Sequence, residues 1–174
     1  MADDRIAIRR LVAADLPAYK ALRDEALAAH PQAFTSDASE TIAKLPESYL
    51  PRLGLGRPEG GHFTLGAWAG TTLVGAVSCE RETRVKVRHI THLIGMMVST
   101  AAQGRGIGSA LLQACLLELR NAADLEMVTL TVTQGNAAAV RLYKRAGFVL
   151  YGSLPRAIRT DDVYHAKDHM VLTL

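Results

Sequence analysis

The second half of the chain carries the clearest hydrophobic patterns. Residues 127–133 (MVTLTVT) alternate strictly, so that Val128, Leu130 and Val132 face one way, as in a half-buried strand. Just before them, apolar residues recur at helical spacing until about Asn121, which predicts a helix. The stripe of this helix consists of Leu111, Leu112, Cys115, Leu116 and Leu119.

The same patterns divide the rest of the chain into elements. Strands are expected at residues 5–11, 63–69, 72–80, 89–99, 148–159 and 163–174, and helices at residues 15–29, 40–50 and 137–146. Gly70 joins two strands as a hairpin, Gly147 ends the last helix, and the Gly- and Pro-rich residues 51–62 form a loop. We therefore expect a single α/β domain over residues 1–174, with α+β order. Its mixed sheet has about seven strands and is flanked by about four helices.

Composition narrows the class of protein. The 174 residues, 49% hydrophobic and 21% charged, suit one globular domain with a proper core. The net charge of +3 is too small to indicate nucleic-acid binding, although it favours a small anionic ligand. No apolar run approaches a membrane span, and the first ten residues lack the apolar segment of a signal peptide. We expect a cytoplasmic protein without nucleic-acid or membrane partners.

Histidine and cysteine suggest neither a metal site nor a disulfide framework. The six histidines show no metal-ligand spacing, so no metal is expected. Cys79 and Cys115 lie in apolar segments and are interpreted as reduced core thiols. No Cys–His nucleophile pair stands out, which favours chemistry without a covalent cysteine intermediate.

A glycine-rich loop, AAQGRGIGSALL at residues 101–112, separates the long strand from the helix. The N–H groups at a helix N-terminus lack backbone partners and favour phosphate, and glycine lets a bulky anion approach. A Walker loop is excluded because the chain has no Gly-Lys pair. The dinucleotide-binding pattern GxGxxG fits Gly104 and Gly106, but the chain has Ser109 at the position of its last glycine. Glu126, about 20 residues on, also precedes the next strand instead of ending it.

A third pattern, [RQ]xxGx[GA], is met by Gln103, Gly106 and Gly108. A long strand, HLIGMMVS, precedes the loop, and NAAAVRLYKRAGF follows at residues 136–148. With these segments the chain resembles the GCN5-related N-acetyltransferase (GNAT) family over nearly its whole length. The resemblance implies a mostly antiparallel sheet and acetyl-CoA as co-substrate, with the pyrophosphate on the loop.

The same resemblance assigns cofactor contacts along the middle of the chain. The pantetheine arm pairs with the long strand, and the strand after the helix splays away to make room. Asn136 suits either a helix N-cap or a pantetheine contact, and both can hold at once. The implied cofactor-binding residues are Met97, Val98, Gln103, Gly104, Arg105, Gly106, Ile107, Gly108, Ser109, Asn136, Ala139 and Tyr143.

Tyr143 is the candidate catalytic residue. It lies seven residues after Asn136, nearly two helical turns, so both side chains point to one side. Attack of an amine on a thioester expels a thiolate, which benefits from a proton donor, and a phenol can donate at neutral pH. The matching tyrosine of the family is that general acid. A core tyrosine packing the helix is the other interpretation.

Candidates for the acceptor side are Glu80, His89, Arg156 and Tyr164. Glu80 ends a strand, and His89 opens the long strand; either is a candidate base, although deprotonation through water needs none. Arg156 and Tyr164 lie in GSLPRAIRTDDVYHAKDHM, which resembles one bacterial branch of the family. That branch usually has an acidic pair where this chain has Ala166 and Lys167.

The sequence thus predicts an acetyl-CoA-dependent N-acetyltransferase acting on a primary amine by direct attack. The acceptor is either a small molecule or a peptide or protein amine. The alternative is a non-catalytic acetyl-CoA-binding module with the same fold. A homodimer is expected, because edge strands near the C-terminus often pair in dimers of the family.

Overall fold

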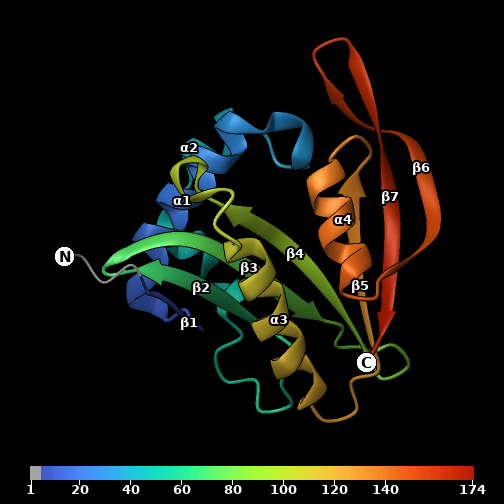
Figure 1. Cartoon of the computed structure of the whole chain (residues 1–174). Coiled ribbons are helices and arrows are strands. Elements are labelled where there is room, and N and C mark those ends of the chain that lie inside the picture. Colours follow the sequence, from blue (N-terminus) through green and yellow to red (C-terminus); the bar gives the residue numbers. More distant parts are fainter. Residues whose placement is uncertain (1–4) are drawn as a thin grey trace.

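The computed structural model describes residues 5–174, which form one mixed sheet with helices on both faces (Figure 1). Met1 to Asp4, part of the stretch from which the absence of a signal peptide is expected, lie outside these residues. The strands are β1 (Ile6–Arg10), β2 (Phe63–Ala69), β3 (Thr72–Arg81), β4 (Ile90–Val98), β5 (Met127–Thr133), β6 (Val149–Thr160) and β7 (Val163–Thr173). The helices are α1 (Leu16–Ala29), α2 (Ala38–Ile42), α3 (Ile107–Arg120) and α4 (Ala137–Arg145). Short 3₁₀ turns are η1 (Ala13–Asp15), η2 (Pro31–Ala33), η3 (Pro46–Leu53) and η4 (Thr100–Ala102).

The strand order is β1-β2-β3-β4-β5-β7-β6, and every neighbouring pair is antiparallel except β4 and β5. The parallel pair is joined through α3, the crossover that a parallel connection needs. The predicted mixed, mostly antiparallel sheet of about seven strands with about four helices is therefore confirmed.

Two hydrophobic cores lie on opposite faces of the sheet. One packs α3 and α4 against β2 to β5 and includes the predicted stripe of α3, from Leu111 to Leu119. The other packs α1 and η3 against β3 and β4. Neighbouring residues of β3 show the alternation, because Ala76 belongs to the α1 core and Val77 to the α3 core.

The predicted helix at residues 40–50 is wrong. The structure has the short α2, which Asp37 caps by accepting a hydrogen bond from the Ser39 N–H at 2.8 Å, and then η3. Leu45 between them is extended, as expected for a residue before proline, and Pro46 starts the next turn. η3 also covers the start of the predicted loop at residues 51–62. The other predicted boundaries lie close to the observed ones.

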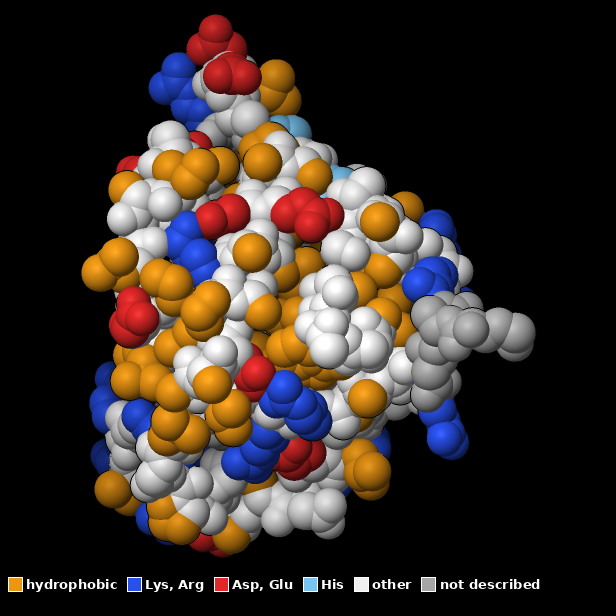
Figure 2. Space-filling view, turned by 90° about the vertical axis from the view of Figure 1, so that its left-hand side faces the viewer, with side chains coloured by type: hydrophobic (Ala, Val, Ile, Leu, Met, Phe, Trp, Pro, Cys, Tyr) orange, Lys and Arg blue, Asp and Glu red, His pale blue; other side chains and the backbone are white. Residues whose placement is uncertain are grey.

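The long β6–β7 hairpin projects beyond the body of the molecule, and the same projection rises at the top of the face seen in Figure 2. On that face apolar and charged side chains are intermixed, without a large area of one charge. Over residues 5–174 no helix has both the length and the apolar character that crossing a bilayer requires.

Candidate active site

The site begins where β4 and β5 separate. Residues 90–92 pair with residues 127–129, and within the described chain the ladder between the two strands goes no further. The strands then diverge, with α3 over one and α4 over the other (Figure 1). The edge of β4 that faces β5 is thus left without a strand partner from residue 93 onward. This is the separation that the family resemblance predicts.

A cavity of about 290 Å³ lies in this gap and has two walls of different character. The first, the α4 wall, consists of residues 93–96 of β4, residues 131–133 of β5, and Asn136, Ala139, Leu142 and Tyr143. The second, the arginine wall, consists of Arg23, residues 33–36, Arg52 and Lys167. The segment from η2 to Ser36 closes the upper end of the gap, where the Thr133 hydroxyl donates to the Gln32 carbonyl at 2.8 Å.

A β-bulge in β4 borders both walls. The β3–β4 pairing shifts register between Ala76 and Ser78, so that Met97 and Ile94 become their partners. Gly95 sits in the bulge with φ +58°, a backbone conformation that favours glycine. The extra residue changes which face of the sheet the side chains of β4 point to. Leu93 therefore packs into the α3 core, whereas Met97 packs into the α1 core.

The glycine loop lies at the N-terminus of α3. Gly104 and Gly106 have φ of +77° and +76°, and a Cβ on either would meet nothing within 4 Å. Backbone conformation therefore explains these two glycines better than packing does. The first hydrogen bond of α3 runs from the Ala110 N–H to the Gly106 carbonyl. The N–H groups of residues 107–109 are thus the free donors of the first helical turn.

Gly108 links this loop to α4. A Cβ placed on it would lie 3.8 Å from the Leu142 side chain and 3.9 Å from that of Val98. The loop, the end of β4 and α4 are therefore close together, on the same side of the gap. Three of the predicted cofactor residues line the cavity itself, namely Asn136, Ala139 and Tyr143. The others, Met97, Val98 and residues 103–109, follow from the end of β4 to the start of α3.

The α4 residues bear out their expected geometry. The Asn136 side chain accepts a hydrogen bond from the Ala139 N–H at 3.2 Å, so the N-cap is confirmed. Asn136 and Tyr143 both line the cavity, as their spacing predicts. Tyr143 is 5% exposed, its ring packs edge-on against Phe148, and burial raises the pKa of its hydroxyl. Among the residues described, nothing accepts a hydrogen bond from that hydroxyl.

The arginine wall was not predicted from the sequence. Arg23 is only 4% exposed and comes from the buried face of α1, four residues after Tyr19 and three before Ala26. A charged residue among the apolar positions of a helix is the sequence pattern that could have indicated this buried cation. Arg52 comes from η3, and Lys167 from β7, where its ammonium donates to the Thr35 hydroxyl at 2.8 Å. Partial burial lowers the pKa of Lys167.

The four predicted acceptor-side residues do not line this cavity. Glu80 lies near Arg52, with its Oε1 4.0 Å from Nε of that arginine. His89 lies just before β4, in a separate shallow pocket with Asp124 and Glu126. Arg156 has φ +54° in a bulge of β6 and stacks on the Tyr164 ring at 3.9 Å.

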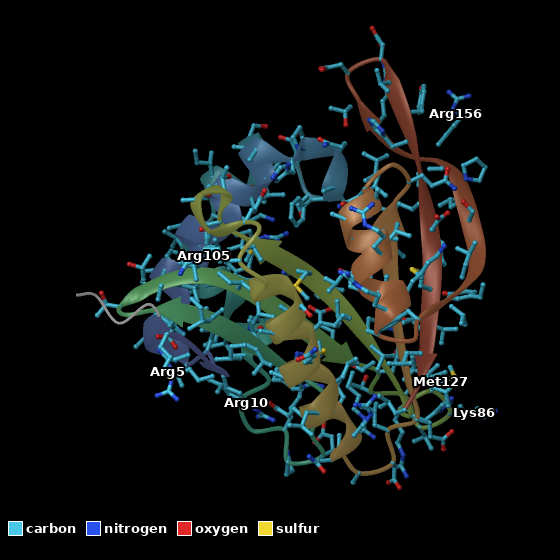
Figure 3. The ribbon with its side chains drawn as sticks, in the orientation of Figure 1. Arg5, Arg10, Lys86, Arg105, Met127 and Arg156 are labelled. Carbon is cyan, nitrogen blue, oxygen red and sulfur yellow. The ribbon has the colours of Figure 1, made fainter. Side chains whose placement is uncertain are left out.

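Figure 3 places Arg156 out on the projecting hairpin, whereas Arg105 lies beside the start of α3. The structure thus brings Arg156 and Tyr164 together, but away from Tyr143 and the glycine loop. Their assignment to acceptor binding stays a prediction.

The cysteines lie in the core where α3 packs on β3, as expected. Both are buried, and the Sγ atoms of Cys79 and Cys115 are 3.3 Å apart as free thiols. Contact with Cys115 and burial raise the pKa of Cys79 well above its ordinary value. A thiol in this state is a poor nucleophile.

Comparison with known proteins agrees with this geometry. The model of the acetyltransferase (GNAT) family matches residues 19–148. Mycothiol acetyltransferase from Salinispora tropica is 31% identical over 140 residues, 80% of this chain and 43% of that protein. The chain thus spans less than half the length of this relative.

Solved structures show the same fold at low identity. An acetyltransferase of the GNAT family from Streptococcus pneumoniae superposes with a TM-score of 0.87 at 24% identity, covering 98% of this chain and all of that one. The yncA protein from Salmonella typhimurium, solved with its cofactor acetyl-CoA, gives a TM-score of 0.78 at 23% identity, with 98% and 94% coverage. The family model spans the separated strands, the glycine loop and α4, and the chain therefore belongs to the acetyltransferase (GNAT) family.

Proposed function

We propose that the protein is an acetyl-CoA-dependent N-acetyltransferase that acetylates a primary amine by direct attack. The observation that carries this proposal is the gap between β4 and β5, which joins an unpaired strand edge, a glycine-rich helix N-terminus and a buried tyrosine. These are the three features that a pyrophosphate, a peptide-like arm and a departing thiolate need. The acetyl-CoA complex of the similar yncA protein supports the choice of co-substrate.

Each part of the co-substrate has matching groups in the chain. The N–H groups of residues 104–109 and the positive end of α3 suit the pyrophosphate. The free edge of β4, up to Met97 and Val98, suits the amides of the pantetheine arm, which would add to it like a strand. Asn136 and Ala139 then face the arm from α4. This assignment keeps the thioester end beside Tyr143.

The reaction balances without a covalent enzyme intermediate. The neutral amine nitrogen attacks the thioester carbonyl carbon, the C–N bond forms and the C–S bond breaks. The sulfur leaves with the electron pair of the C–S bond and takes the proton of the Tyr143 hydroxyl. The nitrogen loses its extra proton to solvent, from which Tyr143 is reprotonated. The products are the N-acetyl amine and coenzyme A with a free thiol.

The state of Tyr143 suits the role of acid. Burial raises its pKa, so the phenol is protonated at neutral pH and above. Its hydroxyl has no competing acceptor in the described part of the chain. A tyrosine that only packed the core would be equally buried, so turnover has to decide between the two roles.

The test is acceptor-dependent release of free thiol from acetyl-CoA, measured with a thiol-reactive dye over a panel of amines. The proposal expects release that rises with amine concentration, and an acetylated product by mass spectrometry. A non-catalytic binding module would instead bind acetyl-CoA, by calorimetry, without release that depends on any amine. Loss of binding as well would contradict both functions.

We also propose that the protein is a cytoplasmic homodimer. β6 is an edge strand of the sheet, and its Val149, Leu150 and Tyr151 are 60%, 55% and 60% exposed. Such an edge is a site at which a second copy can pair. Sedimentation equilibrium is the test, and a monomer at micromolar concentration would contradict the dimer.

A further inference from the structure

Arg23 is a buried cation without a carboxylate partner. Its side chain is 4% exposed, and Nη2 donates to the Ser36 hydroxyl at 3.0 Å. Across residues 5–174 it forms no ion pair, and its Nε is buried without an acceptor. A guanidinium has five donors and is seldom buried unless an anion faces it. The unused donors of Arg23 therefore indicate an anion that the described chain does not supply.

Arg52 reaches the same place from η3. A Cβ built on Gly95 would lie 3.2 Å from Nη1 of Arg52 and 3.8 Å from Nη1 of Arg23. The two guanidiniums therefore meet over the bulge of β4. Nη1 of Arg52 donates to the Tyr19 hydroxyl at 3.0 Å, and Glu80 approaches only its Nε, at 4.0 Å. Two cations are thus opposed by one distant carboxylate, which lies off the cavity wall.

Aromatic rings hold these cations without neutralising them. The guanidinium carbons of Arg23 and Arg52 each lie 5.6 Å from the ring centre of Tyr49, and Arg23 lies 6.0 Å from that of Phe34. Such contacts fix the guanidinium planes. With Lys167, three cationic side chains line the cavity, and no carboxylate is found among its described lining residues.

We propose that the acceptor is a small amine with a carboxylate close to its amino group, that is, a free amino acid or a near analogue. Arg23 and Arg52 bind the carboxylate over Gly95, which directs the amino group toward the gap between β4 and β5. The guanidinium fork matches a carboxylate in two hydrogen bonds. The cavity of about 290 Å³ also receives the end of the pantetheine arm along the α4 wall, so the space that remains beside the arginine wall suits only a small acceptor. A peptide N-terminus has a neutral amide in place of that carboxylate, so it would leave the two arginines without an anion.

The inference rests on the proposed function, and its test keeps the two separate. Each of a panel of L-amino acids is compared with its amide and with its decarboxylated amine, by thiol release. For the best amino acid we expect a kcat/KM on the order of 100-fold above that of the other two. Equal or faster reaction of the amide or the amine would overturn the inference while leaving N-acetyl transfer intact.

A binding experiment tests the inference when no acetylation is detected. If no amine is acetylated, the proposed function fails, and binding then decides the inference. In that case the native protein saturated with coenzyme A is titrated with the amino acids and their amides by calorimetry. Tighter binding of the amino acid supports the carboxylate site, and equal binding overturns it.

Variants assign the effect to the two arginines. Arg52→Met is expected to lower kcat/KM for the amino acid by at least about tenfold through KM, with a clearly smaller effect on the decarboxylated amine, which has no carboxylate to bind. Arg23→Met is expected to do the same, and Arg23→Lys, which keeps the charge, covers the case in which Arg23→Met does not fold. Arg120→Met, at the exposed end of α3, is the matched control. Equal losses with both acceptors would show that the arginines only support the fold, and would overturn the proposal.

Discussion

The two walls of the cavity are built in different ways. The α4 wall uses backbone edges, apolar side chains and one tyrosine, all from the segment that runs from β4 to α4. The arginine wall gathers Arg23, Arg52 and Lys167 from α1, η3 and β7, which are far apart in the sequence. We infer that a compact segment matches the co-substrate, whereas scattered charges match the proposed acceptor.

Tyr143→Phe removes the proposed general acid from the α4 wall and has the largest expected effect. Loss of a general acid is expected to lower kcat by about 100- to 10,000-fold. The affinity for acetyl-CoA, measured by calorimetry, is expected to stay the same, because the described structure shows no hydrogen bond of that hydroxyl. Tyr151→Phe, on the exposed β6, is the control. Unchanged turnover in Tyr143→Phe would make this tyrosine a core residue.

Gly106→Val acts on the same segment through the backbone. At φ +76° a β-branched residue is strained by roughly 1–2 kcal/mol, so the loop has to move or the donors turn away. The dissociation constant of acetyl-CoA is expected to rise about tenfold by calorimetry. Gly56→Val, in the loop between η3 and β2, has the same positive φ of +75° with nothing within 4 Å of the added Cβ and is the control. Unchanged affinity in a folded Gly106→Val protein would place the pyrophosphate elsewhere.

The difference between the walls also explains what the sequence could predict. The glycine loop and the step from Asn136 to Tyr143 are short-range patterns, so their place in the fold follows once the strands and helices around them are known. The bulge at Gly95 is harder to foresee, because an inserted residue becomes visible only against the register of β3. The splay of β4 from β5 came from the family resemblance and not from the residues alone.

The arginine wall depends on contacts that no local pattern encodes. Arg52 reaches Gly95 because η3 packs against α1, and the mistaken helix at residues 40–50 hid that geometry. Lys167 was noticed only as a departure from a family pattern, and the structure shows that it lines the cavity. Conversely, Arg156 and Tyr164, predicted to line the acceptor pocket, contact each other on a hairpin that carries them away from the gap.

Asn136→Ala separates the structural from the binding role of a single α4-wall residue. Removing the N-cap is expected to lower the free energy of unfolding by about 1 kcal/mol, because the Ala139 N–H loses its acceptor. Urea unfolding measures this, and Asn136→Ser, which restores a capping oxygen, is the control. A weaker affinity for acetyl-CoA in Asn136→Ser, which keeps the cap, would indicate that Asn136 also contacts the pantetheine arm. Equal stability of Asn136→Ala and the native protein would contradict the role of the cap.

The smallest expected effect is on the alkaline side of the pH profile. Burial raises the pKa of Tyr143, so the acid keeps its proton as the pH rises through the range in which an ordinary phenol titrates. We expect kcat to rise as the bound amine loses its proton and then to stay level up to about pH 10. Stopped assays at a saturating concentration of both substrates measure it. A falling limb below that pH, absent from Tyr143→Phe, would contradict the raised pKa.

We propose that the gap between β4 and β5 holds acetyl-CoA, and a thermal melt of the native protein is the direct test. The protein is melted alone and with acetyl-CoA, coenzyme A or NAD, each at about 100 times a plausible dissociation constant. A ligand bound only by the folded state adds roughly 2.7 kcal/mol at that ratio, a rise in Tm of about 5–10 °C. We expect this rise with both coenzyme A species and none with NAD. A melt unchanged by either coenzyme A species would contradict it.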